Sequence, residues 1–495
     1  MNRALLPLLL GLPALGAVLL AAIKVPVRTA RTIGTAVSAA TLLVAIEVAT
    51  RFDYGAGGRA QDVVNARWLP TVDVRFHLGI DGISLPLVLL TALLVVLCAA
   101  TIRDRLMMAV VLLLEVGMLG TFVALDLVLF FVFFEVVLIP MYVLIAVWGG
   151  PQRRPAATKF ILFTLLGSGL MLVGFLVMYA ATGTFDMTAL ARAHGHGITA
   201  GTQLLAATLL LVGFGVKSPM WPLHTWLPDA HTEAPTVGSV LLAGVLLKMG
   251  TYGFVRIVVP DLPSGARDLA PALGCLAVAG ILWACFACLA LARGPHADLK
   301  RLIAFSSVGH MGFVLLGIAT LTSAGVQGAL IGNIAHGVIT GLLFFVVGGV
   351  KDRFHTSDVT ELGGGLLAKL PALGGLLLVA SIASLGLPGL AGFWGEMLAL
   401  LGAYSPAAGL SRPLFLTLTG LAAAGTVLTA VYFLAMLRRV DFGVVTDRWR
   451  GERIADAAAV DLVAWTPLVV LAVGIGVWPG LVLRVSESAV KGLLG

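Results

Sequence analysis

The sequence is short of charge. Asp, Glu, Lys and Arg make up only 12% of its 495 residues, whereas 59% are hydrophobic. Soluble domains carry about twice that share of charged residues, so the composition excludes an ordinary soluble fold and is typical of a polytopic membrane protein. The net charge is +7, but no basic run or stacking module accompanies it. We therefore expect lipid around the chain and no nucleic-acid partner.

Cysteine is also scarce. The chain has four cysteines, all in hydrophobic stretches: Cys98, Cys275, Cys285 and Cys288. The last two have the spacing of a metal-binding pair, but no second ligand pair accompanies them, so we interpret them as packing residues. The sequence has no motif for haem, flavin or an iron–sulfur cluster. We expect neither a metal nor a cofactor to be bound by this chain.

Long hydrophobic segments are what the sequence has in abundance. Each is roughly 18–25 residues long and can span about 30 Å at 1.5 Å per residue. The fourteen segments lie near 4–23, 32–49, 82–102, 107–124, 127–147, 159–181, 201–225, 236–257, 271–292, 302–321, 326–350, 371–402, 413–437 and 462–483. The first is interpreted as a retained membrane helix. We predict an all-α polytopic membrane protein with about fourteen transmembrane helices.

Two segments contain helix breaks. Residues 212–235 read VGFGVKSPMWPLHTWLPDAHTEAP, and the segment at 371–402 contains GLPGLAGFWGE. Proline has no N–H to give the helix and crowds the carbonyl four residues back. In hydrocarbon, the freed backbone groups are tolerated only where protein or a water-filled cavity satisfies them. We predict breaks near Pro219 and Pro388; the alternative at the first is a helix that ends at Lys217 before a surface loop.

The two breaks occupy equivalent places in two blocks of five segments. Each lies in the fourth segment of its block, and blocks separated by five segments run in opposite directions, as in the inverted repeats of secondary transporters. We predict four regions: three N-terminal helices with an external loop (1–106), a first repeat (107–257), a second repeat (271–437), and a cytoplasmic loop with the final helix (438–495).

Basic residues are divided unequally between the two membrane sides. Of the 32 Lys and Arg residues, alternate loops place 19 on one side and 11 on the other, and Lys217 and Lys248 lie inside segments. Cytoplasmic loops carry the excess of positive charge. We therefore expect a multi-pass protein of the plasma or inner membrane with both termini on the external side.

Ionisable side chains lie where lipid is expected, although a charge at the membrane centre costs about 2.5–3.5 kcal/mol even on a lenient scale. Glu135 lies in the fifth segment, Lys217 at the first break, Lys248 at the centre of the eighth and Glu396 after the second break. Lys248 is some eleven residues from either end of its segment and cannot easily snorkel. Pairing with a lysine would ease the desolvation of Glu135.

Histidines extend this set into a possible path for protons. His310 and His336 lie in the tenth and eleventh segments; the alternative for each is a bond to a neighbouring helix. Burial disfavours the charged form of a side chain, whereas a nearby opposite charge favours it. Modest changes of distance or hydration can therefore switch the protonation of such a row of residues. Moving a proton against 100 mV costs about 2.3 kcal/mol, which lies within the range of such shifts.

Polar residues also follow the first break. We predict that His224, Asp229, His231 and Glu233 form a channel mouth or cap the next segment. Their spacing does not match a zinc motif. Glu115, in the middle of the fourth segment, also needs a polar partner but has no role we can specify. The loop at 51–76 carries no assignable motif.

Four stretches together resemble the antiporter-like subunits of respiratory complex I, the proton-translocating NADH–quinone oxidoreductase. They read DLVLFFVFFEVVLIPMYVLIAVWG, VKSPMWPLHTWLPDAHTEAPTVGSVLLAGVLLKMGTYG, DLKRLIAFSSVGHMGFV and LPGLAGFWGEML. The strong resemblance covers about residues 75–440. It implies fourteen helices and two inverted five-helix repeats, in which helices seven and twelve are broken.

The resemblance also implies roles. Glu135 and Lys217 would form an interacting pair, and Lys248 would be the central proton carrier, joined through His310 and His336 to the distal Glu396. NADH, FMN, iron–sulfur clusters and quinone would be bound by other subunits, with sister antiporter-like subunits on either side of this chain. Sister subunits have lysine at the distal position or a long lateral helix after the last segment. This chain differs from both, because it has glutamate at that position and ends soon after its last segment.

Two other functions compete with this one. Subunits of multisubunit sodium/proton exchangers are similar over the same lysine and glutamate motifs, and they carry out no redox chemistry. A structural or assembly protein would leave four membrane charges at two helix breaks unexplained. We expect a membrane subunit that couples quinone reduction elsewhere in its complex to proton pumping.

Overall fold

Helices make up nearly all of the fold. The computed structural model describes residues 4–295 and 297–494. Its uninterrupted long helices are α1 (Leu5–Ala22), α2 (Val27–Arg51), α3 (Ser84–Ala99), α4 (Arg105–Val123), α7 (Arg153–Thr182), α14 (Pro263–Arg293), α15 (Leu299–Ala319), α16 (Ser323–Phe354), α21 (Arg412–Val440) and α23 (Ala459–Val477). A helix satisfies its own backbone groups, which is what hydrocarbon demands of a spanning segment.

Twelve helices in the described part of the chain are long and apolar enough to cross a membrane. Two shorter apolar helices, α3 and α19 (Pro371–Ser384), lie where the two remaining predicted segments fall. The polytopic helical fold is thus confirmed, and the count of fourteen stays a prediction. The last predicted segment, 462–483, is wrong at its end because α23 stops at Val477 and a separate helix, α24 (Gly480–Leu494), follows.

Both predicted helix breaks are present. The first separates α9 (Ala200–Lys217) from α10 (Trp226–Glu233), and the second separates α19 from α20 (Ala391–Tyr404). At the first, the Trp226 indole donates to the freed Val216 carbonyl over 3.0 Å. The alternative of a surface loop after Lys217 is wrong, because Ser218 and Trp226 are completely buried.

The eighth span is irregular in a way that the sequence did not indicate. It runs through α11 (Thr236–Leu241), η3 (Leu242–Leu246), α12 (Leu247–Gly253), η4 (Phe254–Val258) and α13 (Val259–Asp261). The elements η3 and η4 are π-helical turns, which are rare and frequent at functional sites. They flank the short helix that carries Lys248.

The fifth span is interrupted beside Glu135. It consists of α5 (Leu127–Val136) and α6 (Leu138–Trp148), with Val137 between them. Pro140 has no N–H to donate to the carbonyl of Val136, four residues earlier, so a regular helix cannot continue through this point without losing a bond.

Matching backbone contacts close the loops of the two halves. Leu127 N donates to Phe185 O and Met187 N to Leu125 O, at 2.9 and 3.0 Å. The same pattern recurs with Leu299 N to Ser357 O and Val359 N to Ala297 O, at 2.9 and 2.7 Å. In each half, aspartates beside the contact cap the helices that follow: Asp126, Asp186, Asp298 and Asp358.

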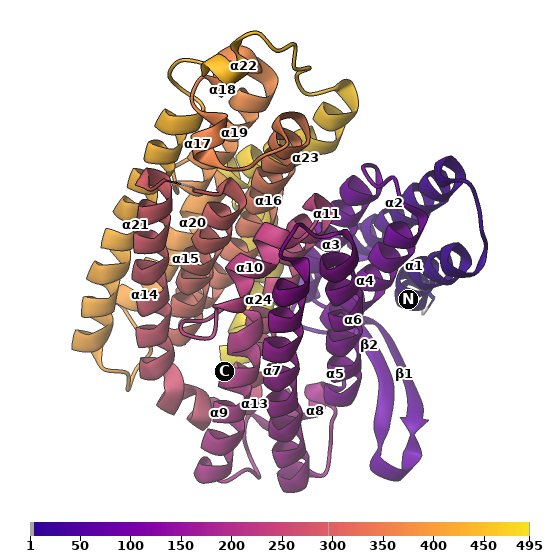
Figure 1. The fold of residues 1–495 in the computed structure, drawn as a ribbon. Coiled ribbons are helices and arrows are strands. Elements are labelled where there is room, and N and C mark those ends of the chain that lie inside the picture. Colours follow the sequence, from indigo (N-terminus) through magenta and orange to yellow (C-terminus); the bar gives the residue numbers. More distant parts are fainter. Residues whose placement is uncertain (1–3, 296, 495) are drawn as a thin grey trace.

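These contacts lie at opposite ends of the bundle, as inverted repeats require. The first pair adjoins strand β2, whereas the second adjoins α17 (Val359–Leu362), which lies at the other end with α18 (Leu366–Lys369) and α22 (Asp447–Arg450) (Figure 1). We call these the hairpin end and the α22 end.

An antiparallel hairpin occupies the loop that showed no motif. Its strands are β1 (Gln61–Leu69) and β2 (Val74–Ile80), flanked by the short turns η1 (Tyr54–Ala56) and η2 (Pro70–Val72). The hairpin is a small addition to a chain that is otherwise helical, as predicted.

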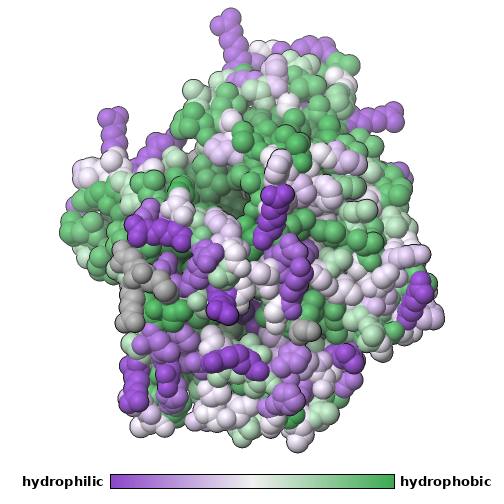
Figure 2. Space-filling model, turned by 180° about the vertical axis from the view of Figure 1, so that it is seen from behind, coloured by the Kyte–Doolittle hydropathy of each residue, from purple (hydrophilic) through white to green (hydrophobic). Residues whose placement is uncertain are grey.

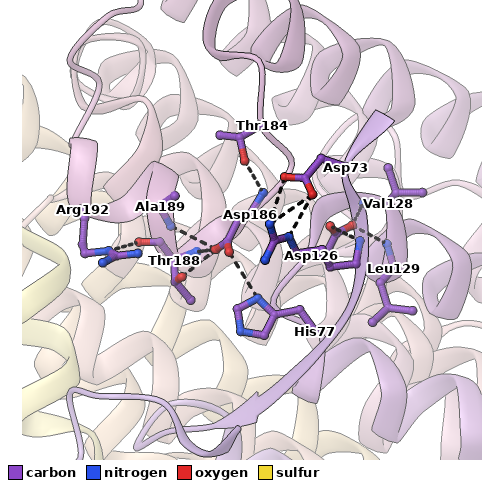
Figure 3. A network of polar contacts seen from close by, with 11 residues as sticks. Asp73, His77, Asp126, Val128, Leu129, Thr184, Asp186, Thr188, Ala189 and Arg192 are labelled. Carbon is purple, nitrogen blue, oxygen red and sulfur yellow. Dashed lines mark hydrogen bonds and ion pairs between the residues drawn. The ribbon is translucent and has the colours of Figure 1, made fainter. Parts of the chain in front are cut away.

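The hairpin is fastened to the helix ends by carboxylates (Figure 3). Arg75 N on β2 donates to Asp126 Oδ2 over 3.1 Å, and His77 Nδ1 lies 3.5 Å from Asp186 Oδ2, before the short helix α8 (Met187–Ala193). Although burial opposes it, the contacts from His77 and Thr188 hold the pKa of Asp186 below its usual range.

Burial separates a core from a periphery. Nearly all side chains of the eighth span, α15 and α16 are buried, whereas α2, α7, α21 and α23 leave most of theirs at least partly exposed. Seen from behind, the molecule has broad hydrophobic areas on its surface (Figure 2). Such a surface suits lipid and neighbouring membrane subunits.

Candidate proton-transfer site

Lys248 lies at the centre of the core. Its side chain is completely buried, and its amine lies 2.6 Å from His336 Nδ1 on α16. The amine also donates to the Ala243 carbonyl in the π-helical turn η3. A buried ammonium requires such polar partners, so the irregular turn and α16 together provide the site that the sequence demanded for this lysine.

The contacts continue from His336 to the second break. The rings of His336 and His310 have centroids 5.7 Å apart. His310 Nδ1 lies 3.3 Å from Glu396 Oε1, and its Nε2 lies 2.9 Å from Ser384 Oγ, the last residue of α19. The structure therefore brings all four predicted residues together, in the spatial order Lys248, His336, His310, Glu396.

A cavity accompanies the second half of this row. Its polar lining includes His310, His336, Thr340, Ser384 and Glu396. A polar space of this kind is where ordered water is expected. Water there would join the two imidazoles and the carboxylate into a continuous path.

Glycines let α20 approach α16 closely and so place Glu396. A Cβ at Gly395 would lie 2.6 Å from Gly332 Cα, and one at Gly402 would lie 2.7 Å from Gly325 Cα. Gly386 in the break has a φ of +72°, a conformation that suits glycine. The short backbone distance holds Glu396 against the histidines.

Glu135 and Lys217 are near each other but do not form an ion pair. The charge of Glu135 acts on Lys217, yet within the described residues no carboxylate oxygen lies within 4.0 Å of the lysine amine. Instead the amine lies 4.7 Å from the centroid of the Phe134 ring. Lys217 is buried and Glu135 is half-buried.

The polar residues after the first break divide into two groups. Asp229 pairs with Lys159 and Arg301 at 2.7 and 3.3 Å, and Glu233 accepts from Gln152 N over 2.8 Å. The expectation that they cap the next segment is wrong, because α11 begins after Pro235 without a side-chain cap.

The two histidines of this region are buried. His231 stacks on Phe344 with centroids 4.6 Å apart, and neither of its ring nitrogens has a hydrogen-bond partner among the described residues. The charges of Lys248 and Lys300 both act on it. His224 lies near Trp283 and Phe305. These positions place His231, rather than Asp229, on the Lys248 side of the region.

Sequence reasoning missed several polar contacts. Lys300 was counted among loop charges, but it is buried and donates to the Ala234 carbonyl over 2.6 Å. Arg256, for which the sequence predicted no partner, forms a largely buried ion pair with Asp81. Glu115 is buried, and its carboxylate has no hydrogen-bond partner in the described part of the chain. In the sequence, Lys300 lies two residues before the hydrophobic segment near 302–321, so its burial could not be predicted.

A family described as NADH:quinone oxidoreductase/Mrp antiporter, TM, matches residues 124–422. The chain is 39% identical over 482 residues to NADH-quinone oxidoreductase subunit M of Rhodobacter capsulatus, covering 94% of this chain and 91% of the relative.

Chains of solved membrane complexes have the same fold as this chain. A chain of respiratory complex I from Thermus thermophilus with bound NADH superposes with a TM-score of 0.87 at 30% identity, covering 99% of this chain and 100% of that one. A chain of the Mrp complex from Dietzia sp. superposes with a TM-score of 0.85 over the full length of both chains, at 21% identity. The second likeness bears on the fold alone.

Proposed function

The chain belongs to the family of transmembrane subunits of NADH:quinone oxidoreductases and Mrp antiporters, and from this membership we propose that it is the subunit-M-type membrane subunit of a proton-translocating NADH–quinone oxidoreductase. The observation that carries the proposal is the row Lys248–His336–His310–Glu396, built from four core elements in a chain that covers its subunit M relatives nearly end to end. Every member of this row can hold a proton.

Protons pass along the row by changes of partner. Lys248 gives its proton to His336 across their 2.6 Å contact. From there it reaches His310 through the polar cavity and then the Glu396 carboxylate. Because each group is buried, its protonation responds strongly to the charge of its neighbours. A change at one end of the row therefore alters the proton affinity of the next group.

Lys217 and Glu135 modulate the row. When the two lie in contact, the carboxylate neutralises the lysine; when they separate, the lysine retains a full positive charge within the core. That charge lowers the tendency of Lys248 to keep its own proton. Motion of the interrupted fifth span is therefore a means of driving protons off Lys248.

Electron transfer takes place elsewhere in the assembly. NADH, FMN, iron–sulfur clusters and quinone are bound by other subunits, and sister antiporter-like subunits lie on either side of this chain. The α22 end, which carries the predicted excess of Lys and Arg, faces the cytoplasm, and the hairpin end and both termini face outward. The membrane is the plasma or inner membrane.

A subunit of a sodium/proton exchanger is the second candidate. The Mrp complex shares the fold, but its identity to this chain is 21%, against 39% for subunit M of Rhodobacter capsulatus. A pull-down through a tag on this chain, in mild detergent, separates the two. Quinone reduction by NADH in the eluate supports the respiratory enzyme; an eluate without it that exchanges sodium for protons after reconstitution supports the exchanger.

Substitution tests the row directly. We expect Lys248→Ala and Glu135→Gln to remove most NADH-driven proton uptake by inverted membrane vesicles, because the first deletes the central carrier and the second the partner of Lys217. Lys24→Ala, at an exposed residue, and Glu47→Gln, at a half-buried residue of α2, are matched controls that keep it. Unchanged proton yield per NADH in either core variant, at equal amounts of inserted chain, would contradict the assigned roles.

A further inference from the structure

Phe134 lies beneath the amine of Lys217. The nitrogen is 4.7 Å from the centroid of the ring, and the exposed fractions of the two residues are 2% and 3%. The face of an aromatic ring attracts a cation within about 6 Å, and the attraction is strongest where water is excluded, as it is here. The ring is therefore a binding partner of the lysine and not merely a packing neighbour.

The two partners of Lys217 are consecutive residues of α5. Side chains of consecutive helical residues point about 100° apart, so the Phe134 ring and the Glu135 carboxylate offer the amine two separate positions. Lysine has a flexible four-carbon stem that reaches either one. The structure shows the amine on the ring, with the charge of Glu135 acting on it from farther away.

The local backbone favours a change between these positions. The interruption at Val137 and the missing N–H of Pro140 lie directly after Glu135. Glu135 is the residue nearer to this interruption and is half-buried, so its carboxylate can move relative to the amine. Phe134 is held more firmly, because it packs against Phe130 and Phe214 with centroids 5.8 and 6.4 Å apart.

The ring position faces the core. Phe130 packs on Tyr252, one turn beyond Lys248 on the same short helix, with centroids 6.4 Å apart. Phe214 lies on α9, one turn before Lys217. A lysine on the Phe134 ring is thus directed towards the elements that carry Lys248, whereas Glu135 is half-buried and nearer the surface.

We propose that Phe134 is a positioning residue that holds the charged amine of Lys217 whenever it is separated from Glu135. The inference rests on the proposed function and deepens it. An aromatic ring carries no net charge, so on the ring the lysine keeps its full positive charge, which discourages Lys248 from retaining a proton. On Glu135 that charge is neutralised. Phe134 thereby defines the second state of the switch.

Fluorinated phenylalanines at position 134 test this in the assembled complex. Fluorine withdraws electron density from the ring face and leaves the shape of the side chain nearly unchanged. We expect NADH-driven proton uptake to decline stepwise from one to three fluorines. The alkaline limb of its pH profile should move to lower pH, by about one unit, because the charged lysine loses stabilisation. The fluorinated variants leave Glu135 unchanged, and within the described residues Glu135 is the charged group that acts on Lys217.

Natural substitutions give the second readout. We expect Phe134→Leu to lower proton uptake about tenfold, and Phe134→Tyr and Phe134→Trp to restore most of it. Phe130→Leu is the matched control, since Phe130 belongs to the same aromatic cluster but does not lie under the lysine; it should keep the wild-type pH profile.

Two results would overturn the proposal. One is wild-type proton uptake and pH dependence with the fluorinated residues, since those variants preserve packing. The other is equal impairment by Phe134→Leu and Phe130→Leu without recovery by tyrosine or tryptophan, which would reduce Phe134 to packing. Failure of the proposed function looks different: the wild-type complex itself would take up no protons with NADH.

Discussion

The carboxylate of Glu396 has a different partner for each oxygen. Oε1 faces His310 at 3.3 Å, and Oε2 accepts a hydrogen bond from Thr426 Oγ1 on α21 over 3.1 Å. A donor to one oxygen stabilises the ionised form. Thr426 therefore holds one oxygen of Glu396 in place while the other faces His310.

Thr426→Val removes this donor without changing the side-chain shape. The carboxylate should lose one of the two contacts that hold it beside His310, so NADH-driven proton uptake should fall. Thr426→Ser should restore it. Thr419→Val is the control, because its hydroxyl donates only to the Phe415 carbonyl. Equal proton uptake by Thr426→Val and Thr419→Val would remove Thr426 from the path.

Some residues of the site could be predicted from the sequence and others could not. Lys248, His336 and Glu396 could be predicted because a charged or titratable group is conspicuous in a hydrophobic run. Thr426 and Ser384 could not, since a hydroxyl in a membrane helix costs little when it bonds to a carbonyl of its own helix. Phe134 was hidden for another reason: nothing distinguishes one aromatic side chain in FFVFFE from the next.

Among elements, the contact of α20 with α16 sets the distance from Glu396 to the histidines. Gly395→Ala should push the two helices apart, because its Cβ would lie 2.6 Å from the Gly332 backbone. We expect a loss of about 1–3 kcal/mol in stability, the usual cost of overpacking, together with reduced proton uptake. Gly420→Ala on α21, whose Cβ would have open space, is the control. Thermal unfolding in detergent and vesicle assays measure both effects.

Proline and glycine positions decided which irregularities of the helices could be predicted from the sequence. Proline and glycine marked the two breaks at Pro219 and Pro388, and both were confirmed. The π-helical turns carry no such residue pattern, since LAGVL and FVRIV are ordinary helical sequence; tertiary packing selects them. The hairpin was missed because β1 is mostly exposed and lacks the alternation of a half-buried strand.

At the scale of the whole molecule, stability depends on pH through Asp441, which follows α21 at the α22 end. Its carboxylate is buried without a hydrogen-bond partner among the described residues, and burial raises its pKa to about 7. A raised pKa in the folded state means that stability is full below the unfolded pKa, near 4, and is lost as pH rises through about 7.

Asp441→Asn should therefore stabilise the folded chain at pH 8 by on the order of 1–3 kcal/mol and have little effect at pH 5. Thermal unfolding at the two pH values checks this, with the exposed Asp447→Asn as the control in the same loop. An equal effect of Asp441→Asn at both pH values would show that ionisation of this carboxylate does not weaken the fold.

Because π-helical turns flank Lys248, the direction in which its side chain points depends on the number of residues in those turns. Each turn holds one residue more than an α-helical turn of the same place would, and one residue corresponds to about 100° of rotation. Substitutions within residues 242–246 leave that count unchanged. Insertion or deletion of a single codon there is the genetic event that swings the lysine towards or away from His336, so the proton row could be acquired or lost in one step without any change to its own members.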